Sequence, residues 1–168
     1  WCNPCKLMEK TVFSLPEVGR YYNEHFVSYR IDVEKGERID FKKKYTITGY
    51  PSFLFFNEDG SLAQQAQGTE GVNSARGFIA LAKEASDPEF ALFSLKKKYD
   101  TGNREEEFLI KYLLAKLRAY HFPENCKTEM EEYIKLHPVP LVVNVNNWTF
   151  IRSFITDINH PYFIELKK

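Results

Sequence analysis

The first half of the chain has hydrophobic residues at helical spacing in four places. Apolar side chains three or four positions apart predict helices that follow residue 2 as far as Phe13 and that cover about 16–23, 38–45 and 72–85. Residues 14–17, Ser-Leu-Pro-Glu, have the pattern of a capping box with an early proline, which predicts the start of the second helix.

Strand-like patterns separate these helices. Apolar residues alternate with polar ones over 26–33, and the continuous apolar run 52–56 has the length of a buried strand. The turn residues of 57–60 then predict that 61–68 returns as an antiparallel partner, although its glutamines and alanines have low β propensity. The order helix, strand, helix, strand, strand, helix predicts an α/β unit.

The pattern changes at Asp87, after which helical spacing dominates. An all-α region over 87–168 is expected, with helices from Asp87 to about residue 100, from Asn103 to about His121, over Glu124–Leu136, over about 148–158, and from His160 onward. Residues 138–140, Pro-Val-Pro, are a linker. The run 141–143 fits a β segment or an apolar loop, and a loop is favoured. These helical hairpins resemble tetratricopeptide-type arrays but lack the full repeat signature.

Composition narrows the classes of protein that need to be considered. Hydrophobic residues make up 43% of the chain and aromatic residues 15%, which supports a packed core rather than disorder. The 23 basic and 23 acidic side chains cancel, so we expect no binding to nucleic acid or to an anionic membrane surface. The lysine runs 42–44 and 96–98 are interpreted as solvated helix faces. No apolar stretch approaches the roughly 20 residues of a membrane span.

Two cysteines at the start of the chain form the candidate chemical site. Cys2 and Cys5 are separated by two residues and are followed by sequence that favours a helix, which predicts a dithiol at a helix N-terminus. Unpaired backbone N–H groups and the helix dipole favour a thiolate at Cys2. Cys5 lies one turn later on the same face, where it can attack a mixed disulfide at Cys2. Pro4 fits the first turn.

The sequence Trp1-Cys2-Asn3-Pro4-Cys5, followed by lysine, resembles the W-C-x-x-C-K signature of the thioredoxin family. The resemblance extends to the sequence Gly-Tyr-Pro-Ser at 49–52, since the family places a cis-proline loop opposite its dithiol. It covers residues 1–86 and implies a thioredoxin-like domain whose first strand, the one leading into Trp1, is not in this sequence.

The same resemblance implies a thiol–disulfide oxidoreductase in which Cys2 attacks and Cys5 resolves. Substrate is expected between Trp1 on one side and Tyr50-Pro51 on the other, with Tyr50 bulkier than the family's usual residue. The partners implied are protein dithiols and disulfides and an upstream reductant, without a cofactor. Reduction is favoured over oxidation because Asn-Pro between the cysteines is closer to the Gly-Pro of reductases than to the Pro-His of oxidants.

Two features depart from the family or add to it. Ser28 stands where the family often has a lysine, so a buried proton relay is not carried over. The helical extension resembles that of thioredoxin-family proteins from Bacteroidetes-type bacteria, which implies a periplasmic or other extracytoplasmic location, with the cytoplasm left open.

The same cysteines allow other interpretations. Two cysteines at this spacing can form half of a zinc site, but no second pair of ligands has suitable spacing, and Lys6 in place of histidine excludes a covalent haem motif. Cys126 is interpreted as an apolar filler between helices rather than as a third redox partner. The alternative function is a protein-binding module that uses the C-terminal helices, with the redox domain structural.

Overall fold

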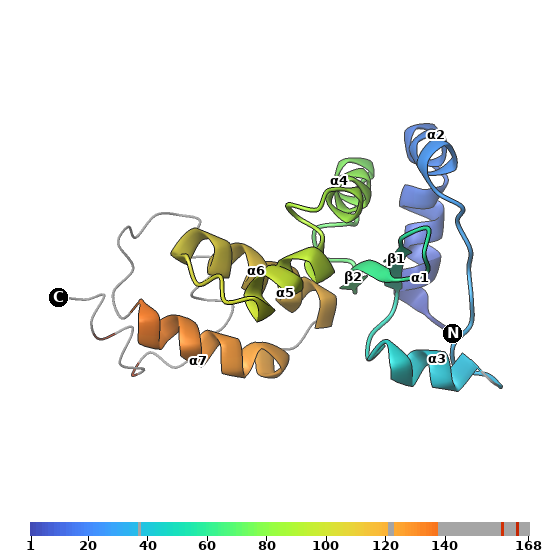
Figure 1. Cartoon of the computed structure of the whole chain (residues 1–168). Helices are drawn as coiled ribbons and strands as arrows, with labels where there is room; N and C mark the ends of the chain where they lie inside the picture. Colours follow the sequence, from blue (N-terminus) through green and yellow to red (C-terminus); the bar gives the residue numbers. More distant parts are fainter. Residues whose placement is uncertain (37, 121–122, 138–158, 160–163, 165–168) are drawn as a thin grey trace.

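The computed structural model describes residues 1–36, 38–120, 123–137, 159 and 164 (Figure 1). The elements in chain order are α1 (Asn3–Met8), η1 (Glu9–Phe13), α2 (Pro16–His25), α3 (Arg38–Lys44), β1 (Ser52–Phe56), β2 (Leu62–Gln67), α4 (Ala75–Ser86), α5 (Leu92–Asp100), α6 (Glu106–Tyr120), η2 (Pro123–Cys126) and α7 (Lys127–Leu136). Here η1 is a π-helical turn that continues α1, and η2 is a 3₁₀ turn. An α/β unit is thus followed by a helical region, as the sequence predicts.

The described sheet consists of β1 and β2, paired antiparallel with Ser52 opposite Gln67. The predicted turn is present: the N–H of Asn57 donates to the carbonyl of Ser61 at 2.8 Å, and Gly60 has a φ of 78°. That backbone conformation favours glycine because it has no Cβ to clash. The pairing is irregular between Phe55 and Phe56.

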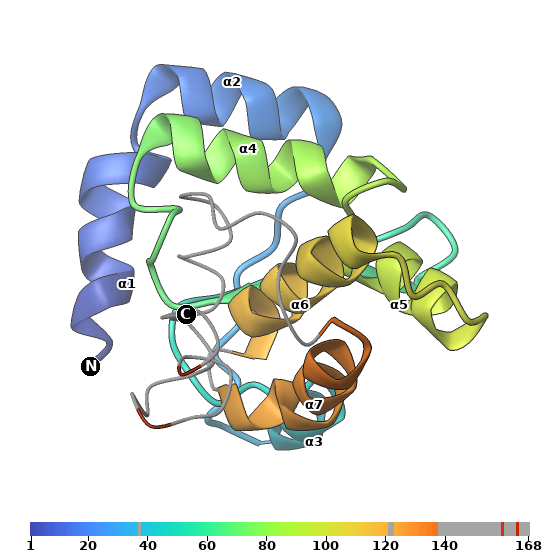
Figure 2. The same cartoon turned by 90° about the vertical axis from the view of Figure 1, so that its left-hand side faces the viewer.

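A hydrophobic core joins the helix that carries Cys2 and Cys5 to the sheet. Met8 and Val12 from α1 and η1, Val18 from α2 and Phe78 from α4 are all buried in it together with Phe55 of β1. Figure 2 shows α2 and α4 lying side by side, and the hydroxyl of Tyr22 donates to the carbonyl of Phe78 at 2.8 Å. The helix at the start of the chain is therefore anchored by its inward face.

The helices of the second half pack on β2 and on one another. Both α5 and α6 contact β2, which lies between β1 and this helical pair in Figure 1. Gln64 of β2 is buried and its side-chain oxygen accepts a hydrogen bond from the N–H of Leu92 at 3.3 Å. Leu109 and Tyr112 of α6 belong to two different buried clusters, so α6 is buried on more than one side, as expected.

The predicted strand over 26–33 is wrong. This segment is not a strand, and the side chains of Val27 and Tyr29 are 102% and 86% exposed. A β-strand requires a hydrogen-bonded neighbour, and within the described residues only β1 and β2 pair. The alternation of apolar residues therefore indicates β propensity, but among the described residues this segment has no neighbouring strand with which to pair.

Several helix starts also differ from the sequence prediction. Leu15, not Ser14, is the N-cap of α2, because the Ser14 hydroxyl donates to the carbonyl of Lys10 instead. Asp87 caps a turn by accepting from the N–H of Glu89, so that α5 begins only at Leu92. Ser74 is the N-cap of α4, a few residues later than predicted. Of the later helices, α6 begins at Glu106 rather than directly after Asn103, and α7 begins at Lys127 rather than at Glu124.

The predictions for 141–143, 148–158 and the helix from His160 fall outside the described residues. Among the helices that the structure does describe, none combines the length and the apolar character needed to cross a membrane.

Candidate active site

The two cysteines of the motif lie at the start of α1 and are joined as a disulfide. Cys2 is the N-cap residue, Pro4 lies in the first turn, and the Cα atoms of Cys2 and Cys5 are 5.3 Å apart. The N–H of Cys5 donates to the Sγ of Cys2 at 3.2 Å. After reduction, a donor in this position stabilises negative charge on the Cys2 sulfur. Both cysteines are half-buried, so a substrate can reach them.

Trp1 and Tyr50 bring the cysteine motif and the proline loop together. Their ring centroids are 5.1 Å apart with an interplanar angle of 89°, the edge-to-face geometry that aromatic pairs prefer. Trp1 is 72% exposed and directly precedes Cys2. Tyr50 directly precedes Pro51, and the bond between these two residues is cis, as the motif predicts. The residue pairs predicted from sequence are therefore neighbours in space.

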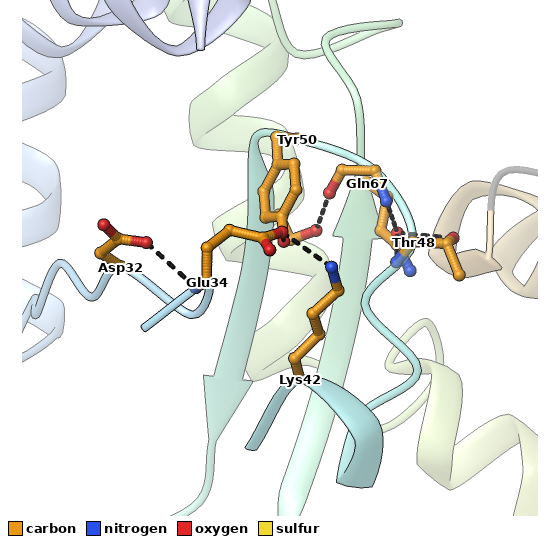
Figure 3. A network of polar contacts seen from close by, with 8 residues as sticks. Asp32, Glu34, Lys42, Thr48, Tyr50 and Gln67 are labelled. Carbon is orange, nitrogen blue, oxygen red and sulfur yellow. Dashed lines mark hydrogen bonds and ion pairs between the residues drawn. The ribbon is translucent and has the colours of Figure 1, made fainter. Parts of the chain in front are cut away.

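Gln67 holds the backbone that leads into the proline loop. Its side-chain oxygen accepts hydrogen bonds from the N–H groups of Thr48 and Gly49, at 2.9 and 2.8 Å, and from the Thr48 hydroxyl (Figure 3). Its side-chain nitrogen donates to the carbonyl of Thr46 at 3.0 Å. Gln67 is only 3% exposed, so these bonds are shielded from water.

The sequence prediction did not identify this role of Gln67. A signal was present, since a buried strand that carries glutamines needs partners for their amide groups.

Glu34 and Lys42 hold the side chain of Tyr50. The Tyr50 hydroxyl donates to a carboxylate oxygen of Glu34, and Lys42 Nζ donates to the same oxygen at 2.7 Å. The Lys42 ammonium also lies 5.5 Å from the centre of the Tyr50 ring. Asp32 in turn accepts a hydrogen bond from the N–H of Glu34 at 3.0 Å (Figure 3). Lys42 is therefore an exception among the lysines that were interpreted as a solvated face.

These contacts shift the proton affinities of the three side chains. Hydrogen bonds from Lys42 and then from Tyr50 lower the pKa of Glu34, and the hydrogen bond to Glu34 raises the pKa of Lys42. Burial, and then the bond to Glu34, raises the pKa of Tyr50. At neutral pH the network therefore consists of a carboxylate, an ammonium and a neutral phenol.

A shallow cavity of about 510 Å³ adjoins this network on the side of α3. Glu34, Lys42 and Ile39 contribute to its lining, whereas the cysteines and Trp1 do not. The half-buried disulfide is therefore not part of this cavity.

The surroundings of Cys126 differ from those of the two cysteines in the motif. It is fully buried with Leu109, Leu113 and Met130, in agreement with its interpretation as an apolar filler, and burial raises the pKa of its thiol to about 11. Across residues 1–36, 38–120 and 123–137, no three His, Cys, Asp or Glu side chains gather in a way that could hold a metal ion.

Comparison with known proteins shows which family this chain is similar to. Residues 1–86 match the model of the family described as "Thioredoxin-like domain". The chain is 39% identical to "Thioredoxin-1" of Drosophila melanogaster over 70 residues, which are 42% of this chain and 61% of that protein. It is 40% identical to "Thioredoxin-1" of Drosophila yakuba over 63 residues, or 38% of this chain and 54% of the relative.

A bacterial protein is also similar. The "Thiol:disulfide interchange protein DsbD" of Pseudomonas fluorescens is 30% identical over 80 residues, which are 47% of this chain and 14% of that protein. The chain thus spans little more than half the length of the two Drosophila relatives and a small part of the bacterial one. No solved structure matches it significantly.

Proposed function

This chain belongs to the thioredoxin-like family, and from that premise we propose that its Cys2–Cys5 pair reduces or exchanges disulfide bonds in other proteins. The family match and the half-buried cysteine pair support thiol–disulfide oxidoreductase activity in general. The observation that carries the specific proposal is the position of Cys2: it is a helix N-cap with an N–H donor on its sulfur, beside the Trp1–Tyr50 contact.

The reaction begins from the reduced pair. The Cys2 thiolate attacks one sulfur of a substrate disulfide, that bond breaks, and the second substrate sulfur leaves as a thiolate that takes up a proton. Cys5 then loses its proton and attacks the Cys2 sulfur of the mixed disulfide. The Cys2–Cys5 disulfide forms, the substrate leaves as a dithiol, and two electrons have passed from the enzyme to the substrate. A dithiol reductant returns the enzyme to its starting state.

The direction of reduction is supported by the Asn-Pro sequence between the cysteines, which is closer to the Gly-Pro of reductases than to the Pro-His of oxidants. The bacterial relative is named for thiol:disulfide interchange, which fits exchange as well as reduction.

Substrate recognition is assigned to Trp1, Tyr50 and Pro51. Among the described residues, neither the N–H nor the carbonyl of Tyr50 takes part in a backbone hydrogen bond. An extended substrate segment can use both groups, as peptides do when they pair with a strand edge. Pro51 contributes no N–H of its own, and its carbonyl accepts from the N–H of Gly68 at 2.8 Å.

The proposal divides the chain into a redox unit at 1–86 and a helical unit at 87–168, with an extracytoplasmic location on the basis of the resemblance to Bacteroidetes-type proteins. The alternative function, partner binding by the helices, stays a prediction. Its test is whether the full chain still binds a partner protein after Cys2 and Cys5 are replaced by serine.

Turnover of insulin disulfides with dithiothreitol as electron donor tests the proposal. The wild-type chain and a Cys126→Ala control should both accelerate precipitation of the insulin B chain, while Cys2→Ser should show only the rate of dithiothreitol alone. Equal rates for wild type and Cys2→Ser would remove the reductase function.

A further inference from the structure

We propose that Glu34 and Lys42 are positioning residues that hold the Tyr50 ring in its edge-to-face contact with Trp1, so that the substrate-binding surface beside Cys2 has a fixed aromatic wall. This inference rests on the reductase function proposed above and adds a determinant of affinity for protein substrates. It is carried by the contacts around Tyr50, since three separate parts of the chain meet at that side chain.

The first step concerns the freedom of the Tyr50 side chain. A tyrosine on an open surface can turn about two torsions, and ordering it upon substrate binding costs conformational entropy. Here the hydroxyl is fixed by the carboxylate of Glu34, which is a charge-assisted hydrogen bond. The Lys42 ammonium near the ring face adds a cation–π contact. The ring is thus ordered before any substrate arrives.

The second step concerns how Glu34 itself is held. Its carboxylate accepts from Lys42 Nζ of α3 at 2.7 Å, and its N–H donates to the Asp32 side chain at 3.0 Å. Both the backbone and the side chain of Glu34 are therefore constrained (Figure 3). Lys42 is in turn placed by a helix, an element that is more rigid than a loop.

The third step connects the ring to the reactive sulfur. The rings of Tyr50 and Trp1 meet edge to face, and among the described residues this is the ring contact that Trp1 makes. On the other side, Gln67 fixes the loop backbone at Thr48 and Gly49. With both the backbone and the ring fixed, the wall keeps its shape next to Cys2.

The network is exposed enough to be removed without unfolding the chain. The side chains of Glu34 and Lys42 are 38% and 33% exposed, and ion pairs at such positions contribute little to stability. Variants of these residues therefore test the substrate-binding surface without unfolding the chain. Far-UV circular dichroism and urea midpoints will verify that the fold is kept.

The steady-state test uses Glu34→Ala, Lys42→Met and Tyr50→Phe, with Lys43→Met as the matched control. Lys43 is the next residue of α3, but its ammonium is directed to Asp40, at 3.8 Å. Each test variant should raise the KM for insulin about threefold to tenfold with a smaller change in kcat, the size expected for one exposed charge-assisted hydrogen bond. Lys42→Arg should restore most of the loss, and Lys43→Met should behave as wild type.

A double mutant separates a shared mechanism from independent effects. If Glu34 acts through the Tyr50 hydroxyl, Glu34→Ala combined with Tyr50→Phe should be no worse than either single variant. Additive losses in kcat/KM, or a KM for insulin unchanged in all three single variants, would overturn the proposal.

A spectroscopic measurement tests the wall even if the reductase function fails. The chain has two tryptophans, so a Trp148→Phe background isolates the fluorescence of Trp1. Glu34→Ala and Tyr50→Phe should then lower the anisotropy of Trp1 and increase its quenching by acrylamide, whereas Lys43→Met should not. Unchanged Trp1 signals would contradict the positioning role, whatever the activity assays give.

Discussion

The three thiols of this chain differ sharply in their surroundings. Cys2 and Cys5 are half-buried at a helix start and bonded to each other, while Cys126 is fully buried among apolar side chains. Cysteine reactivity follows the fraction of thiolate and the access of the reagent. The same residue type therefore has a chemical role at one end of the chain and a packing role at the other.

Alkylation should separate these two classes of thiol. After reduction of the disulfide, iodoacetamide at pH 8 should modify Cys2 and Cys5 but leave Cys126 intact. The pKa of Cys126 is about 11, so at pH 8 only about a thousandth of that thiol is thiolate, even before limited access is considered. Intact mass spectrometry counts the adducts, and all three should form in concentrated urea. Rapid modification of Cys126 in the folded chain would contradict its burial.

Gln67 should be the most costly of the strand glutamines to replace. Gln67→Leu leaves the N–H groups of Thr48 and Gly49 without their acceptor, and we expect a loss of about 2–4 kcal/mol in the free energy of unfolding. Gln65→Leu is the matched control, because the Gln65 side chain donates one hydrogen bond, to the carbonyl of Tyr45 at 2.9 Å. In urea denaturation, Gln67→Leu should have a much lower free energy of unfolding than Gln65→Leu. The reverse order would contradict the role of Gln67 in holding the loop backbone.

For single residues, the sequence predicted the role of those that stand in a local sequence motif or pattern. Cys2, Cys5 and Pro51 stand in motifs, and Cys126 stands in an apolar helical pattern. Glu34, Lys42 and Gln67 were missed because each acts on residues between 8 and 21 positions away. Such pairs are defined by the tertiary fold, which spacing along the chain does not encode.

The helix that carries the cysteines is anchored on one face only. Met8 is 1% exposed within the core, whereas its neighbour Leu7 is 61% exposed. Helical geometry places adjacent residues about 100° apart, so they need not share an environment.

These adjacent positions allow a controlled test of that anchoring. Met8→Ala should destabilise the chain by about 2–5 kcal/mol, because a buried side chain is truncated and a cavity remains. Leu7→Ala should change the free energy of unfolding by no more than about 0.5 kcal/mol. Thermal or urea unfolding measures both, and similar losses for the two variants would mean that the helix faces the core differently.

Strand prediction succeeded where the partner lies nearby in the sequence and failed where it does not. The segments 52–56 and 61–68 are joined by a short turn, so the sequence contained both members of the pair. The segment 26–33 has the stronger β propensity but no described neighbour, whereas β2 forms despite its glutamines because their amides find partners. Pairing, rather than propensity, decided both outcomes.

Considered as a whole, the molecule joins two sets of helices through β2. The core around Met8 and Phe78 and the clusters around Leu109 and Leu95 are separate, yet α5 and α6 cover β2. The pattern change at Asp87 predicts that a second unit begins there, and this boundary stays a prediction. The packing of the later helices on the sheet required the structure, because contacts between distant segments leave no periodic signal.

Removal of the helical unit should therefore weaken the redox unit. A chain that ends at Ser86 loses the cover of α5 and α6 on β2, and the side-chain oxygen of Gln64 loses one of its donors, the N–H of Leu92. We expect a lower urea midpoint and stronger binding of a hydrophobic dye than for the full chain. A truncated chain as stable as the full one would show that the two units fold independently.

The central claim is that Cys2 attacks a substrate disulfide and Cys5 completes the exchange, and trapping the mixed disulfide tests it most directly. A reduced Cys5→Ser variant mixed with a disulfide-bonded protein should accumulate a covalent adduct at Cys2, detected by non-reducing electrophoresis and mass spectrometry and released by dithiothreitol. The matched Cys2→Ser variant should trap little. An adduct that forms at Cys5 in preference to Cys2, or none with either variant, would contradict the assignment of nucleophile and resolving thiol.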